Sequence, residues 1–178
     1  LLDKLFVVMR RMFHPTLALV LTTLCDHLHD GIGRGDELMH EFCFPSALEY
    51  YSEVILFNFS FAHPPKMHKR CGPPVPQVIS KGRPAYKSLL RLRELHLRTG
   101  CKYCYPKVSK AGVVSPTRRL TQATALRHIR AGLAEVLGSK ERAAQYGLHG
   151  LRAGGACDAL MRGVPPSAIK AQGHWALD

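Results

Sequence analysis

The sequence lacks the features that would place it in a membrane or in a disulfide-stabilised secreted scaffold. No apolar run is long enough to span a bilayer, and the first residues, Leu1 to Arg11, show no signal-peptide cleavage pattern. The six cysteines follow no regular framework, and a chain of 178 residues does not need disulfides to fold. We therefore interpret the cysteines as reduced thiols and expect an intracellular protein without a membrane partner.

An initiator methionine, internal repeats and low-complexity segments are also missing. Hydrophobic residues make up 46% of the chain, which is enough for a packed core and excludes wholesale disorder. A chain of this length is typical of one domain. We expect residues 1–178 to form a single domain that was cut from something longer.

Acidic residues are scarce, and their distribution is uneven. The chain has 25 Lys and Arg against 13 Asp and Glu, for a net charge of +12. Residues 1–60 carry four basic and eight acidic residues, whereas residues 61–178 carry 21 and five. A basic surface of this size favours a polyanionic partner, with nucleic acid as the first candidate. The alternative is a soluble protein that is merely basic.

Apolar residues recur at helical spacing through most of the chain, with one β-type run near the middle. The expected helices cover residues 3–13, 16–28, a short segment from Arg34, 85–97, 120–137, 153–161, and a last one opened by Pro165 or Pro166. The β-type run at 54–61 and a return strand at 77–80 predict a small antiparallel sheet inserted at 50–80. Residues 99–119, rich in Pro, Gly and basic residues, are expected to form a basic loop. The predicted fold class is mainly α with a small antiparallel β-sheet (α+β).

The stretch Leu148 to Ala156 is the strongest candidate for a functional site. Gly147 and Gly150 bracket His149, which predicts a tight or left-handed turn followed by a helix start. Arg152 follows His149 at i+3, so the two side chains share one face of that helix. An imidazole and a guanidinium side by side at a helix start favour phosphate binding.

Two other segments fit the same purpose. The segment Val164 to Trp175 predicts a short helix that ends at Gly173 and is followed by His174. Upstream, Arg34 lies at the mouth of a short helix, where amides and guanidinium point toward the same space. The alternative for Arg34 is a surface ion pair with Asp30 or Asp36.

These segments carry a family resemblance. An Arg-x-x-Glu-Leu box at Arg34, a His-x-x-Arg box at His149 and a later Gly-His at His174 resemble, in that order, the catalytic domain of tyrosine recombinases, the phage-type integrases. The similarity is greatest to the recombinases of eukaryotic mobile elements. It implies DNA recombination and integration, in which a tyrosine cleaves a DNA strand through a 3′-phosphotyrosyl bond. It also implies double-stranded DNA as the partner, a homo-oligomer on DNA, no metal or other cofactor, and a location in the nucleus of a eukaryote or otherwise in the cytoplasm or nucleoid.

The resemblance implies roles for individual residues. Those expected to act on the phosphate are Arg34, Lys66, His149, Arg152 and His174. In this scheme the two arginines hold the non-bridging oxygens, and Lys66, with Lys69 as the alternative, protonates the leaving oxygen. Glu37 and Trp175 are expected to support the site from behind. Further basic residues expected to contact DNA are Lys69, Arg70, Arg118, Arg119 and Arg127. For the 66–70 tip, a solvated basic loop that touches DNA phosphates remains an equal alternative.

One departure from the family pattern concerns the nucleophile. The family's tyrosine lies roughly nine residues past the Gly-His position, which falls beyond Asp178. The alternatives are therefore a non-catalytic DNA-binding remnant, a type IB topoisomerase-like enzyme, or a zinc-bearing interaction module. The zinc module would be built on Cys101 and Cys104, with His96 nearby, but a structural site needs four ligands.

We predict that residues 1–178 bind duplex DNA without cleaving it. Affinity should fall steeply as salt rises, because basic side chains displace condensed counterions from the phosphates. Fluorescence anisotropy measures the binding, and denaturing electrophoresis detects covalent protein–DNA adducts. An adduct formed by this chain would show that a tyrosine within it acts as the nucleophile.

Overall fold

The computed structural model describes residues 1–39, 43–58 and 76–175. Its elements, in chain order, are α1 (Leu2–Met12), α2 (Pro15–Asp30), α3 (Gly35–Leu38), a 3-10 turn (Pro45–Ala47), β1 (Leu48–Tyr50), β2 (Val54–Phe57), β3 (Gln77–Ser80), α5 (Pro84–Thr99), β4 (Pro106–Val108), β5 (Val114–Arg119), α6 (Gln122–Leu137), α7 (Lys140–Ala144), α8 (Leu148–Met161) and α9 (Pro166–Gly173). The expected class, mainly helical with small antiparallel sheets, is confirmed.

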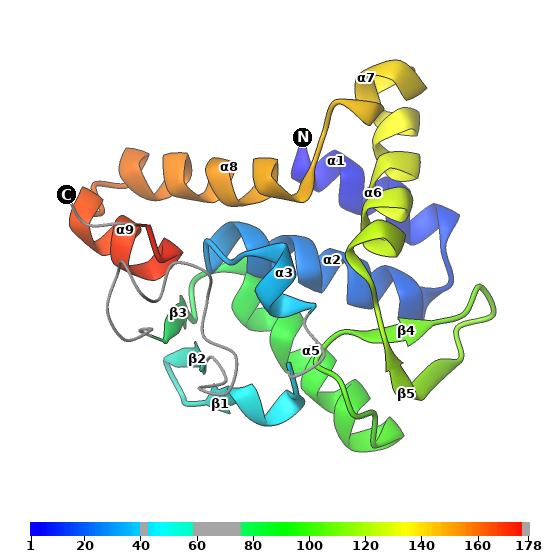
Figure 1. The fold of residues 1–178 in the computed structure, drawn as a ribbon, viewed down its shortest axis with the longest axis horizontal. Helices are drawn as coiled ribbons and strands as arrows, with labels where there is room; N and C mark the ends of the chain where they lie inside the picture. Colours follow the sequence, from blue (N-terminus) through cyan, green and yellow to red (C-terminus); the bar gives the residue numbers. More distant parts are fainter. Residues whose placement is uncertain (40–42, 59–75, 176–178) are drawn as a thin grey trace.

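Helix α2 forms the centre of the molecule (Figure 1). It begins at Pro15, which suits the first turn of a helix, and His14 accepts a hydrogen bond from the Thr16 amide. Its residues from Val20 to Leu28 are all buried. Helices α5, α8 and α1 pack on it from different sides. The hydrophobic core therefore surrounds α2, which explains why its apolar residues are not restricted to one stripe.

The three-stranded sheet lies next to α5 and α9, in the order β1-β2-β3. Its strands pair antiparallel, with Ile55 of β2 opposite Ile79 of β3 and both side chains fully buried. This confirms the strand and the return strand expected from the sequence. The sheet starts at Leu48, two residues before the expected boundary.

The expected loop at 99–119 is wrong in part, because β4 and β5 form a second antiparallel pair there. Pro106 is the first residue of β4, a position where a strand tolerates the missing amide donor. Pro116 accepts a hydrogen bond from the Lys102 amide at 2.8 Å through its carbonyl. The turn residue Gly112 has φ +81°, which only glycine adopts readily. These residues therefore shape a hairpin.

Two helix boundaries also differ from expectation. The helix expected at 153–161 begins at Leu148. The short α7 was not expected. Its N-cap is Ser139, which accepts a hydrogen bond from the Arg142 amide at 3.1 Å, and a serine at this position is a common helix-start signal. None of the helices in the described ranges has the length and apolar character needed to cross a membrane.

Asp26 of α2 is 9% exposed and lines a cavity together with Ser88 of α5. Burial raises its pKa to about 6, the Ser88 hydrogen bond lowers it, and the nearby Asp30 raises it further. The unfolded chain ionises this group near 3.8. Its contribution is therefore most favourable below pH 3.8 and is lost as the pH rises through about 6.

We expect Asp26→Asn to stabilise the protein at neutral pH, by on the order of 3 kcal/mol, because the amide never ionises. The gain should grow between pH 4 and pH 7, measured by urea unfolding followed by circular dichroism. Asp30→Asn is the matched control and should destabilise over the same range. Burial alone would raise the Asp30 pKa, but hydrogen bonds from His29, the Ala85 amide and Arg83 hold it below its usual value. A gain for Asp26→Asn that does not change with pH would contradict this assignment.

Candidate functional site

The His149 to Arg152 segment forms the first turn of α8. Gly147 caps the helix in an extended conformation, and Gly150 is helical, so the left-handed option for the turn around His149 is wrong. The turn is tight, since the Gly150 amide donates to the Gly147 carbonyl at 3.0 Å. His149 is exposed, whereas Arg152 is only 5% exposed. One turn of helix therefore presents an imidazole to solvent and points a guanidinium inward.

The Arg152 guanidinium is held from two sides. Its carbon lies 4.1 Å from the centre of the Trp175 ring, which is cation–π geometry. Its Nη2 donates a hydrogen bond to the carbonyl oxygen of Gly173. Both contacts come from the end of α9, so the side chain joins the start of one helix to the end of another. Trp175 was expected to support the site, but the sequence did not indicate that Arg152 is the residue it contacts.

Helix α9 ends in a way that makes these contacts feasible. His174 follows it with φ 52°, a left-handed conformation, and is buried. A Cβ on Gly173 would lie 2.4 Å from the Trp175 ring. Glycine at this position therefore lets the tryptophan fold back toward Arg152, and the same turn buries His174.

The bare surface expected at Gly154 and Gly155 contacts the end of α2. A Cβ on Gly155 would lie 1.8 Å from the carbonyl oxygen of His29, so only glycine fits there. A Cβ on Gly154 would meet the His29 ring at an ordinary 3.6 Å. Helix α8 is thus in backbone contact with the end of α2, and Figure 1 shows α8 lying along one side of α2.

Arg34 directly precedes α3 and is half-buried. A Cβ on the next residue, Gly35, would lie 3.0 Å from Cδ1 of Leu148, the first residue of α8. The start of the Arg34 helix therefore lies against the start of the helix that carries His149 and Arg152. Residues separated by more than a hundred positions in the sequence come together here.

The loop before Arg34 rests on buried polar side chains. Ile32 has φ 53°, which is unusual for a β-branched residue. Below it, His27 Nδ1 hydrogen-bonds the Tyr105 hydroxyl at 2.7 Å. Burial lowers the His27 pKa to about 4, despite the opposing effects of the nearby Gln77 and Asp30, so the ring is neutral at pH 7. A Cβ on Gly33 would lie 3.3 Å from the Gln77 amide, so the loop lies close against the Gln77 side chain.

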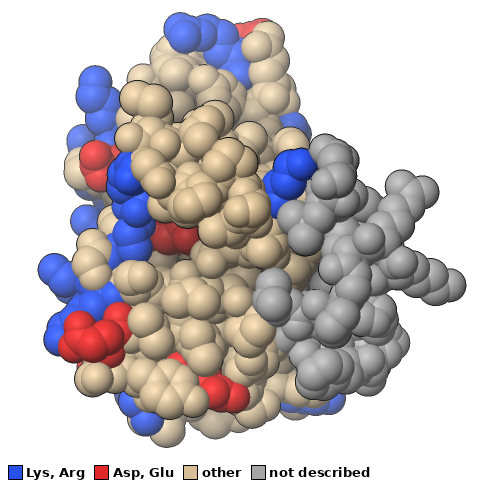
Figure 2. All heavy atoms as spheres, turned by 90° about the vertical axis from the view of Figure 1, so that its left-hand side faces the viewer, with Lys and Arg blue, Asp and Glu red and all other residues tan. Residues whose placement is uncertain are grey.

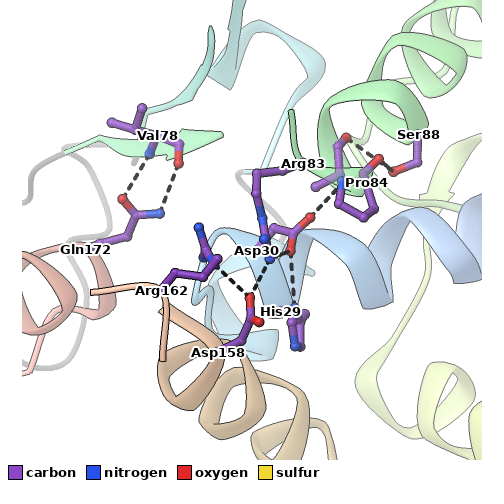
Figure 3. Close-up of polar contacts among 10 residues, drawn as sticks. His29, Asp30, Val78, Arg83, Pro84, Ser88, Asp158, Arg162 and Gln172 are labelled. Atoms are coloured by element: carbon purple, nitrogen blue, oxygen red, sulfur yellow. Dashed lines mark hydrogen bonds and ion pairs between the residues drawn. The ribbon is translucent and has the colours of Figure 1, made fainter. Parts of the chain in front are cut away.

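An ionic network fixes α8 to α2 and α5 (Figure 3). Arg83 Nη2 donates to Asp30 at 2.5 Å and to Asp158 at 2.8 Å. Asp158 also accepts from Arg162 on its own helix at 3.2 Å, and Asp30 accepts from the Ala85 amide at 2.9 Å. Asp30, which the sequence suggested as a partner for Arg34, thus serves Arg83 and the start of α5.

A single side chain connects α9 to the sheet. The amide of Gln172 accepts from the Val78 amide at 3.4 Å and donates to the Val78 carbonyl at 3.0 Å, so it pairs with β3 as a neighbouring strand would (Figure 3). This contact holds the last turn of α9, directly before Gly173 and His174. The sequence does not reveal this pairing or the Arg83 network, because each joins segments that are far apart along the chain.

Several expected site residues lie outside what the structure describes. Lys66, Lys69 and Arg70 are outside the described residues, and the side chain of Glu37 is not described. Arg118 and Arg127 are exposed on β5 and α6. Arg119 is half-buried, and its Nη1 donates to the carbonyl oxygen of Met39 at 2.5 Å.

The cysteines considered for zinc are buried. The Cys104 thiol hydrogen-bonds Cys43, which together with burial raises its pKa well above the usual value. His96 Nε2 hydrogen-bonds the Cys104 carbonyl oxygen at 2.8 Å rather than pointing to a thiol. Across the described ranges, no three His, Cys, Asp or Glu side chains are grouped as metal ligands would be. These contacts give the zinc alternative no support.

Comparisons with known proteins point to one fold. No model of a protein family matches the chain, and no curated protein sequence does. A matching solved structure is the XerH site-specific recombinase bound to difH substrate, a pre-cleavage complex, with a TM-score of 0.59 and 10% sequence identity. The match covers 96% of this chain and 44% of that one, so the chain spans less than half of the recombinase. The expected fold, similar to a tyrosine recombinase catalytic domain, is confirmed.

We expect Gly155→Ala to destabilise the protein by about 2–3 kcal/mol, because its Cβ would collide with the His29 carbonyl and push α8 away from α2. Emission from Trp175, the single tryptophan, should shift as its contact with Arg152 loosens. Gly154→Ala is the matched control and should stabilise α8 by about 0.5–1 kcal/mol through helix propensity. Equal unfolding free energies for the two variants would refute the backbone contact.

Proposed function

We propose that this chain is the catalytic region of a DNA-cleaving and rejoining enzyme of the tyrosine recombinase type. The observation that carries the proposal is the contact between the starts of α3 and α8, which brings the Arg34 segment to the His149 and Arg152 turn. The fold similarity to a site-specific recombinase bound to its substrate supports duplex DNA as the partner. The excess of basic residues in 61–178 agrees with that partner.

The chemistry follows from what each residue can do. A tyrosine hydroxyl attacks the phosphorus, an O–P bond forms to the tyrosine, and the bond to the 5′-oxygen breaks. Arg152, stacked on Trp175, needs little reorganisation to offset the charge that develops on the non-bridging oxygens. In this proposal Arg34, at the start of α3, offsets the same negative charge on the non-bridging oxygens. The reverse reaction rejoins the strand.

The proton transfers fall to the remaining residues. His149 is exposed at the helix start and can accept the proton of the nucleophile or bind the phosphate. His174, held in the left-handed turn after α9, is proposed to hydrogen-bond the phosphate. Lys66 is proposed to donate the proton to the leaving 5′-oxygen, with Lys69 as the alternative.

The nucleophile is proposed to come from sequence beyond Asp178. Three described tyrosines already use their hydroxyls elsewhere. Tyr51 donates to Glu49, Tyr86 donates to backbone carbonyls, and Tyr105 bonds His27 in the core. These contacts suit structural roles.

We expect Arg152→Ala, in a version of the protein that includes the nucleophilic tyrosine, to slow strand cleavage by about 10²–10³-fold at saturating DNA. The variant loses a preorganised charge, so the dissociation constant for DNA should change far less than the rate. Single-turnover cleavage of a nicked duplex that traps the phosphotyrosine measures the rate. Arg98→Ala, at an exposed position on α5, is the control and should cleave at the unaltered rate.

Equal cleavage rates for the two variants would remove Arg152 from the reaction. Because Arg152 is buried, thermal unfolding of both variants must accompany the rates, so that loss of folding is not read as loss of chemistry. DNA binding without any adduct, by the version that includes the tyrosine and carries no substitution, would favour the non-catalytic remnant. Relaxation of supercoils without a specific site would favour the topoisomerase-like alternative.

A further inference from the structure

A basic pocket of about 400 Å³ lies where the β4–β5 pair meets the start of α6. Its lining residues are Tyr103, Lys107, Thr117, Arg118, Arg119, Leu120, Thr121 and Thr124. Every charged residue in this lining is Lys or Arg, and the uncharged ones include hydroxyl groups that can donate hydrogen bonds. The composition suits an anionic ligand.

The surrounding sequence does not neutralise this charge. Between residues 95 and 134 there are eight Lys and Arg and no Asp or Glu. The opposite end of the molecule, viewed from the α9 side, is largely uncharged and carries both acidic and basic groups (Figure 2). The positive charge of residues 95–134 is therefore not balanced within that segment, and a polyanion would relieve its self-repulsion.

The pocket has a fixed floor and a fixed wall. Arg119 is held at the base by its hydrogen bond to the Met39 carbonyl, at 2.5 Å. Tyr103 stacks on Phe44 with ring centres 6.2 Å apart, and Lys102 Nζ lies 5.5 Å from the Tyr103 ring. These contacts come from three separate segments of the chain, so the shape does not depend on one loop.

The start of α6 adds backbone donors. Thr121 caps this 16-residue helix by accepting the Thr124 amide at 3.3 Å. The first amides of a helix have no acceptor within the helix and carry partial positive charge. Lys107 and Arg118, in contrast to Arg119, are exposed and can extend toward a ligand at the rim.

We propose that this pocket binds a backbone phosphate of duplex DNA, at a place separate from the Arg152 centre. Lys107 and Arg118 contact phosphate oxygens, and Tyr103 and the start of α6 fix the position of the strand. Phosphate contacts carry no base information, so the site supplies affinity and register rather than sequence preference. Because Arg119 bonds the residue directly after α3, DNA bound here lies beside the end of the Arg34 helix.

The test compares two double variants that remove the same charge. Lys107→Gln with Arg118→Gln removes the two exposed charges at the rim of the pocket. Lys4→Gln with Arg11→Gln removes one Lys and one Arg from exposed positions on α1. Binding to a duplex of about 30 base pairs is measured by anisotropy from 50 to about 300 mM salt, where each phosphate contact adds about 0.9 to the slope of log K against log salt. The pocket variant should lose about 2 from that slope and at least about tenfold in affinity at 50 mM salt. The affinity of the α1 variant should stay within about twofold of that of the unaltered protein, because the charges it removes contact no phosphate.

Equal slopes and affinities for the two double variants would overturn the proposal. Arg118→Lys keeps the charge and should keep the slope, so an equal loss in Arg118→Lys and Arg118→Gln would also overturn it. All substituted side chains are exposed, and circular dichroism checks that each variant folds. The readout is binding alone. A version that includes the nucleophilic tyrosine but does not cleave DNA would count against the proposed enzyme and would leave this binding result unchanged.

Discussion

The backbone contact between Gly155 and the His29 carbonyl is the constraint on which the rest of the candidate site depends. It sets the distance at which α8 crosses α2, because no side chain can separate the two helices there. Once that crossing is fixed, Asp158 reaches Arg83, and the start of α8 meets Gly35. A small residue in the middle of α8 therefore positions groups at both ends of the helix.

The second constraint is the burial of a guanidinium. An arginine in the interior costs free energy unless its charge and donors are satisfied. Arg152 contacts an aromatic face and a backbone carbonyl. Arg83 is paired with two carboxylates, Asp30 and Asp158, and joins three helices. The two arginines are therefore held by different kinds of group.

Local signals in the sequence were sufficient for most of the fold. Proline at the start of α2, the β-type run around Ile55 and the glycine after α6 each act over a few residues, so the pattern identified these elements. The start of α8 was missed because Gly147 and Gly150 suggested a turn, whereas Gly147 is the N-cap and Gly150 lies inside the helix. The β4–β5 hairpin was missed because proline there occupies strand positions rather than breaking the chain. Secondary-structure propensity alone does not distinguish a glycine or proline that breaks an element from one that belongs to it.

The candidate site could be predicted from the sequence less completely than the fold. The His149 and Arg152 spacing predicted that both lie on the first turns of one helix, since that relation is local, but the structure exposes His149 and buries Arg152. The tertiary contacts of Arg152 with Trp175 and Gly173 were not predicted, because they depend on the left-handed turn at His174. That turn requires Gly173 to lack a side chain, and the Gln172 amide to hold the preceding helical turn against β3. One short helix, anchored on the sheet, thus determines where a buried arginine on another helix can lie.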